Sequence, residues 1–205
     1  AGFALRWFVL LFAGIGGTVS AVLFLDLVPE SMKYMVNRFR VLFDHSLDPL
    51  GVGWHQTRSL LAIGSGGVFG QGYMNGTQSQ SSESQSLPMR WTDFIFSVCG
   101  EELGMVGCIL IILLLTALIF RVLLVAKRSQ TYFHSYVCVG MAAMLIYQTV
   151  INIGMCLFVM PTIGVTLPFF SYGGSSIVTL YTAMGVVSNI KKRTLSMDRR
   201  IRPLL

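Results

Sequence analysis

The sequence predicts an all-α integral membrane protein, and three observations support this fold class. First, 54% of the 205 residues are hydrophobic and only 12% are charged, which is too apolar for a soluble domain of this size. Second, the uncharged runs Trp7 to Leu25 and Leu103 to Phe120 are each long enough to cross a hydrocarbon core of about 30 Å. Third, no Asp, Glu, Lys or Arg occurs from position 129 to position 190.

One helix cannot use so long an uncharged stretch, so this region must contain more than one span. Pro161, Pro168 and the Gly173-Gly174 pair interrupt it and divide it into two spans, which brings the expected number of crossings to four. The expected membrane spans are 1–25, 94–120, 133–158 and 171–190, and the segments between and after them are 26–93, 121–132, 159–170 and 191–205.

The distribution of charge predicts the orientation of these spans. Ten basic residues and one acid, Asp198, fall on one side, whereas segment 26–93 on the opposite side has five basic and six acidic residues. By the positive-inside rule, the basic side with the C-terminus is cytoplasmic and segment 26–93 is extracellular. The ten basic residues are Arg6, Arg121, Lys127, Arg128, Lys191, Lys192, Arg193, Arg199, Arg200 and Arg202.

Segment 26–93 is too long for a plain connection and too apolar for a disordered one, so we expect it to fold against the membrane. Its residues 31–43 have helical amphipathic spacing, with Arg38 and Arg40 off the apolar face, and predict an interfacial helix. This helix either anchors the segment or offers a basic surface to anionic headgroups or a diphosphate. The glycine-rich residues 64–76 similarly serve either close packing or, beside Arg58, phosphate binding.

The net charge of +6 follows from topology and is poor evidence for nucleic-acid binding. All four cysteines lie in or beside the apolar spans without a paired pattern, so we interpret them as small buried hydrophobic residues. The three histidines are scattered, and no metal site is predicted from them.

Two adjacent glutamates, Glu101 and Glu102, interrupt the apolar sequence that follows Asp93. Hydrocarbon tolerates ionisable groups only when they are paired, hydrated or functional, so at least one of the two must face protein. We favour a structural role as a buried charge paired with a basic residue from outside this chain over a second catalytic acid.

Four stretches of the chain resemble one family. They read DPLGVGWHQTRSLLAIGSGGVFGQGYMNGTQSQ, LPMRWTDFIFSVCGEELGMVG, INIGMCLFVMPTIGVTLPFFSYGGSS and AMGVVSNIKK, and they are similar to the C-terminal half of the shape, elongation, division and sporulation (SEDS) proteins, which include RodA, FtsW and SpoVE. The resemblance covers nearly the whole chain from about residue 34. It implies a bundle of ten membrane helices, of which these would be the last four, with 26–93 as the large fourth extracellular loop.

The resemblance also implies an activity, namely polymerisation of lipid II into glycan strands at the outer face of the bacterial cell membrane, beside a class B penicillin-binding protein. The essential aspartate of the family's TDFIF motif is Asp93 here, and a general base is what an attacking sugar hydroxyl requires. Spacing alone would equally allow Asp93 to be a helix N-cap. The candidates for binding the substrate and its leaving diphosphate are Arg38, Arg40, Arg58, Arg90, Ser171, Ser175 and a divalent cation such as Mg or Mn.

Two departures from the family pattern affect the interpretation. Met89, Arg90 and Trp91 follow Leu87-Pro88 where an acid is usual, and Ile163 stands where division-type members tend to have lysine. The second departure favours the RodA-like branch. A flippase for lipid-linked precursors and a non-catalytic scaffold for a transpeptidase remain the alternative functions.

Overall fold

The computed structural model describes residues 52–80 and 87–201 together with Leu10, Gly14 and Arg38. The predicted span 1–25 and interfacial helix 31–43 therefore lie outside the described residues except at these three positions, and Arg40 lies outside them entirely. The described parts are helical, with no strand among them. The helices are α3 (Val52–Gly66), α4 (Ile95–Arg128), α5 (Tyr132–Cys156) and α6 (Gly174–Ile201).

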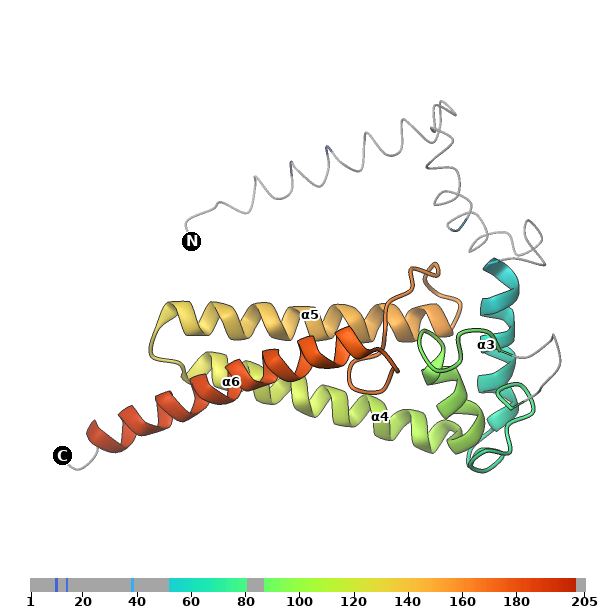
Figure 1. The fold of residues 1–205 in the computed structure, drawn as a ribbon, viewed down its shortest axis with the longest axis horizontal. Coiled ribbons are helices and arrows are strands. Elements are labelled where there is room, and N and C mark those ends of the chain that lie inside the picture. Colours follow the sequence, from blue (N-terminus) through green and yellow to red (C-terminus); the bar gives the residue numbers. More distant parts are fainter. Residues whose placement is uncertain (1–9, 11–13, 15–37, 39–51, 81–86, 202–205) are drawn as a thin grey trace.

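Three of the helices run lengthwise through the molecule. Helices α4 and α5 lie side by side, α6 packs along them, and α3 stands across one end of the group (Figure 1). Two apolar clusters hold this arrangement. One joins the beginning of α4 to the end of α5, around Phe96 and Met155, and the other joins α4, α5 and α6 near Val122, Ala142 and Val187.

Two of the described helices, α4 and α5, are long and apolar enough to cross a membrane. Much of the surface of α4 is both apolar and exposed, as at Leu113 (60% exposed) and Phe120 (59% exposed), and such a surface would be unfavourable in water. Together these features describe a helical membrane protein.

Two helices continue beyond the hydrophobic runs that predicted them. α4 extends past Phe120 to Arg128, into the segment 121–132 that was expected to be a loop. α6 extends past Ile190 to Ile201, into the segment 191–205 that was expected to be a tail. The reason is that lysine and arginine end a stretch that suits hydrocarbon without ending a helix, because both have high helix propensity.

α4 is broken near its beginning, at Gly104, which has a positive φ of 69°. In an unbroken helix, the carbonyls of Glu101 and Glu102 would accept from the N–H groups of Met105 and Val106. Here a loop from the glycine-rich segment intervenes. The two glutamate carbonyls accept from the backbone N–H groups of Gln71 and Gly72. The N–H groups of Met105 and Val106 donate to the carbonyls of Gly67 and Val68, and the four N···O distances are 2.9 to 3.2 Å.

The glycines of segment 64–76 make this insertion possible. A Cβ atom on Gly66 would lie 2.0 Å from the carbonyl oxygen of Gly100, and one on Gly70 would lie 2.2 Å from that of Glu102. Both distances are far below van der Waals contact, so only glycine permits the approach. Of the two interpretations left open by the sequence, close packing is the one that this geometry favours at these positions.

Candidate active site

The carboxylate of Glu101 organises the loop that precedes the candidate site. Its side chain is fully buried, and its Oε1 accepts from the N–H of Gln78 (2.6 Å) and the hydroxyl of Thr77 (3.2 Å), while Oε2 accepts from the N–H of Ser79 (2.8 Å). A buried carboxylate is tolerated when its lone pairs are satisfied in this way. The partners of Glu101 are therefore groups of the chain's own loop, and the ion pair expected from the sequence is not needed to explain its burial.

Glu102 is bound more loosely by the same loop. Its Oε1 accepts from the side chains of Gln80 (2.9 Å) and Ser79 (3.4 Å). Two candidate arginines also attach here, because Arg58 donates to the side-chain oxygen of Gln78 (3.2 Å) and Arg90 donates to the carbonyl of Ser79. The loop at 77–80 thus connects both glutamates to two basic residues.

The backbone immediately before α4 is fixed by three consecutive hydrogen bonds. The carbonyl of Trp91 accepts from the N–H of Tyr172 (2.8 Å), and that of Thr92 accepts from the hydroxyl of Ser171 (2.6 Å). The carbonyl of Asp93 accepts from the amide of Asn152 (2.8 Å). Residues from α5 and from the connection before α6 therefore hold Asp93 in one position.

The side chain of Asp93 remains half-buried beside this connection. The helix N-cap is Phe94 and no side chain caps the helix, so the N-cap role considered for Asp93 is not the one observed. A methyl group on Gly164 would lie 3.6 Å from Oδ2, which places the carboxylate next to the Gly164 backbone. Partial burial raises the pKa of Asp93 above its ordinary value, and a hydrogen bond from Thr92 opposes this effect.

A cavity of about 360 Å³, lined by both polar and apolar side chains, adjoins this position. Gly164 links the two, since it lines the cavity and also lies beside the Asp93 carboxylate. The side-chain oxygen of Gln148, another lining residue, is buried without a hydrogen-bond partner among the described residues. An unsatisfied buried acceptor is costly unless a ligand or water completes it. The cavity is lined by Met144, Gln148, Gly164, Val165, Thr166, Ser175, Ser176, Thr179 and Leu180.

The other residues predicted from the sequence fall into different places. Ser175 lines the cavity, and Arg38 donates to the carbonyl of Thr162, two residues from Gly164. Ser171 is 4% exposed, and its hydroxyl accepts from the N–H of Leu167 (2.7 Å) while donating to Thr92. Because both interactions are internal, we assign Ser171 to fixing the backbone instead of the substrate contact predicted for it.

A match to known proteins identifies the family. A family model named for FtsW, RodA and SpoVE and described as a cell cycle protein matches residues 1–196. The chain belongs to the FtsW/RodA/SpoVE family. This assignment agrees with the SEDS resemblance of its motifs.

Several members of the FtsW/RodA/SpoVE family are similar to the chain. Peptidoglycan glycosyltransferase MrdB of Escherichia coli (strain K12) is 41% identical over 168 residues, covering 82% of this chain and 45% of the relative. Stage V sporulation protein E of Bacillus subtilis (strain 168) is 38% identical over 193 residues, covering 94% and 50%. The chain therefore spans about half the length of these relatives.

A solved structure shares the fold. It is a chain from a peptidoglycan synthase complex described as coordinating polymerization and crosslinking, with a TM-score of 0.72 and 28% sequence identity. The match covers 92% of this chain and 49% of the solved one.

Sequence reasoning missed two amides that matter for the site, Gln148 and Asn152. Asn152 is fully buried and donates to the carbonyls of both Asp93 and Val165, the latter over 2.7 Å. A signal was present, since two amides four residues apart lie on one face of a predominantly apolar helix. Neither amide carries a charge, so neither stands out in an apolar segment as an ionisable group does.

The described residues contain no group of three or more His, Cys, Asp or Glu side chains placed to hold a metal ion. All four cysteines are free; three are buried and Cys99 is half-buried. The predicted role of these cysteines as small apolar side chains fits this placement.

Proposed function

We propose that the chain is the C-terminal half of a peptidoglycan glycosyltransferase that polymerises lipid II, with Asp93 as the general base. One observation carries the proposal. The carboxylate of Asp93 is half-buried beside a cavity, and hydrogen bonds to the backbone carbonyls of Thr92 and Asp93 fix the chain at this point. The names of the relatives, including peptidoglycan glycosyltransferase MrdB, supply the reaction class.

The chemistry assigns a distinct task to each part of the site. In glycosyl transfer the acceptor hydroxyl attacks the anomeric carbon of the donor, the bond to the diphosphate breaks, and the hydroxyl proton passes to a base. The carboxylate of Asp93 would accept this proton. Its raised pKa makes it a stronger base than an exposed aspartate.

Positive charge must stabilise the departing diphosphate. Arg38 is the best-placed candidate, because its bond to the carbonyl of Thr162 brings it within two residues of Gly164 and hence near Asp93. Arg58 and Arg90 gather at the loop of residues 77–80, and we propose them as the outer part of the same basic surface. A divalent cation such as Mg or Mn would be a further source of positive charge for the diphosphate.

The cavity offers hydrogen bonds to a sugar. Its volume of about 360 Å³ is at the lower end of the range for ligand pockets, which suits part of a saccharide headgroup. We propose that Gln148 accepts a hydrogen bond from a substrate hydroxyl and that Ser175 donates another. The substrate would thereby complete the acceptor of Gln148 that the chain leaves unsatisfied.

The proposal includes sidedness and a partner. The excess of basic residues in 121–132 and 191–205 supports placing Asp93 at the extracellular face of a ten-helix bundle, with the C-terminus in the cytoplasm. The similar solved chain comes from a complex that couples polymerization to crosslinking, which supports a class B penicillin-binding protein as the partner of this one.

The test uses the complete protein, since the chain is about half of its relatives. The protein is incubated with fluorescent lipid II, with and without a class B penicillin-binding protein from the same genome, and products are separated on a gel. A ladder of glycan strands is expected. Absence of polymer under all conditions, with binding to the partner retained, would establish the scaffold function instead.

A further inference from the structure

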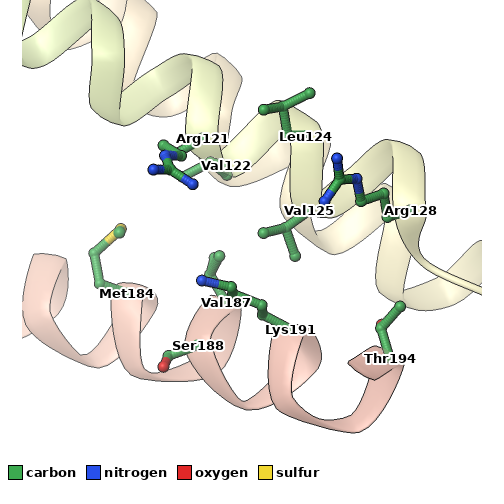
Figure 2. A pocket seen from close by; sticks show the side chains of 10 residues that line it. All are labelled: Arg121, Val122, Leu124, Val125, Arg128, Met184, Val187, Ser188, Lys191 and Thr194. Carbon is green, nitrogen blue, oxygen red and sulfur yellow. The ribbon is translucent and has the colours of Figure 1, made fainter. Parts of the chain in front are cut away.

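A second cavity, of about 430 Å³, lies between α4 and α6, far along α4 from Asp93 (Figure 2). Helix α4 begins at Ile95, just after Asp93, whereas the first residue of α4 that lines this cavity is Arg121, so the two sites belong to different ends of the protein. The lining residues are Arg121, Val122, Leu124, Val125, Arg128, Met184, Val187, Ser188, Lys191 and Thr194.

Three positive charges border this cavity. Arg121 and Arg128 belong to α4, and Lys191 belongs to α6, where its side chain lies in the space between the two helices (Figure 2). The acidic side chains that the structure describes are Asp93, which precedes α4, and Glu101 and Glu102 in the first part of α4, so none of these three compensates this charge. Like charges gathered around one cavity repel one another, and an anion bound between them relieves the repulsion.

The remaining lining is both apolar and polar. Val122, Val125 and Val187 belong to its apolar part, which we call the apolar wall, and Ser188 and Thr194 add hydroxyl groups. A small inorganic anion would leave the apolar wall uncovered. The combination fits a ligand that joins an anionic head to hydrocarbon chains.

The position of the cations along the helices indicates a membrane interface. Arg121 is the first charged residue after the uncharged run that ends at Phe120, and Lys191 is the first after the uncharged run that ends at Ile190. The cavity therefore lies where hydrocarbon gives way to phospholipid headgroups.

From this charge complementarity we infer that the cavity binds the phosphate headgroup of an anionic phospholipid, with Arg121, Arg128 and Lys191 holding the phosphate and the apolar wall covering the upper acyl chain. The lipid would bridge α4 and α6. This binding is independent of glycosyl transfer, and its test does not require activity.

The test measures retention of phosphatidylglycerol by the complete purified protein, using native mass spectrometry with phosphatidylcholine as the neutral comparison. The double variant Arg128→Gln/Lys191→Gln is compared with Lys127→Gln/Lys192→Gln. The second pair removes two charges from the neighbouring positions, neither of which lines the cavity. Wild-type protein should retain phosphatidylglycerol in preference to phosphatidylcholine, and the first double variant should bind it about 30-fold more weakly. The control pair should bind nearly as wild type.

A variant that leaves the charges intact provides a second measurement. Ser188→Phe should fill the cavity and reduce phosphatidylglycerol retention, whereas Asn189→Phe, at an adjacent residue outside the lining, should not. Equal losses in the two double variants would show only a general attraction to basic residues and would overturn the inference. Displacement of the lipid by millimolar inorganic phosphate would also overturn it. So would an unchanged affinity in Ser188→Phe, which is the result expected if helices of the N-terminal half fill the cavity.

Discussion

Replacing Glu101 with glutamine should destabilise the protein far more than the same change at Glu102. The buried carboxylate of Glu101 accepts three hydrogen bonds, two of them from backbone N–H groups that cannot rotate away. In glutamine, one oxygen becomes an NH₂ group that faces a backbone donor. One bond is lost, an N–H is left unsatisfied, and the two remaining bonds lose their charge assistance, which together cost about 3 kcal/mol.

Among the described residues, Glu102 accepts only from the side chains of Ser79 and Gln80, which can reorient, so we expect its replacement by glutamine to cost about 1 kcal/mol. For a complete protein about twice the length of this chain, these values correspond to melting temperatures lowered by about 4 °C and about 1 °C.

The melting temperature is readily measured in detergent with a thiol-reactive dye, because three of the four free cysteines are buried until the protein unfolds. Wild-type protein and the single variants Glu101→Gln and Glu102→Gln are heated under the same conditions. Equal shifts for the two variants, or no shift for Glu101→Gln, would refute the role of Glu101 in holding the loop of residues 77–80.

Three further predictions concern the site and its orientation. Burial raises the pKa of Asp93, and the base becomes protonated as pH falls through that raised value. The polymerisation rate should therefore begin to fall at a pH above the ordinary pKa of 3.8, and a fall only at or below pH 3.8 would contradict this. Gly164→Ala should slow polymerisation several-fold, because φ is +73° beside the carboxylate, whereas Gly140→Ala, in the open, should not; equal rates in the two variants would be the contrary result. After removal of the native cysteines, Ser82→Cys should react with an impermeant maleimide in intact cells and Ser196→Cys only after lysis, and the reverse pattern would invert the topology.

The sequence was sufficient for those features that depend on local patterns. Uncharged runs and interrupting prolines predicted helices close to α4 and α5, and long motifs such as the one around Asp93 led to the correct family. Such features could be predicted because hydrophobic length and motif identity are properties of neighbouring residues.

Apart from the extended ends of α4 and α6, the features that escaped prediction depend on contacts between distant segments. The break at Gly104 exists because residues 67–72 replace its helical hydrogen bonds, and nothing in the local sequence of α4 indicates that loop as the partner. Likewise, the carboxylate of Glu101 was expected to need a cation, whereas the N–H groups of Gln78 and Ser79, from a separate loop earlier in the chain, bind it. Asn152 of α5 binds the backbone of Asp93, and its role becomes evident only when α5 is placed beside the start of α4.

The most direct test of the account is the rate at which the complete protein forms glycosidic bonds when Asp93 is replaced by asparagine. The variant keeps the shape of the side chain and removes the base, so the rate should fall by about 100- to 10,000-fold. Asp198→Asn, the same exchange in the C-terminal tail, should retain the wild-type rate, and both variants should insert into membranes and bind the partner normally. Polymerisation by Asp93→Asn at a rate near that of the wild type would contradict the assignment of Asp93 as the general base.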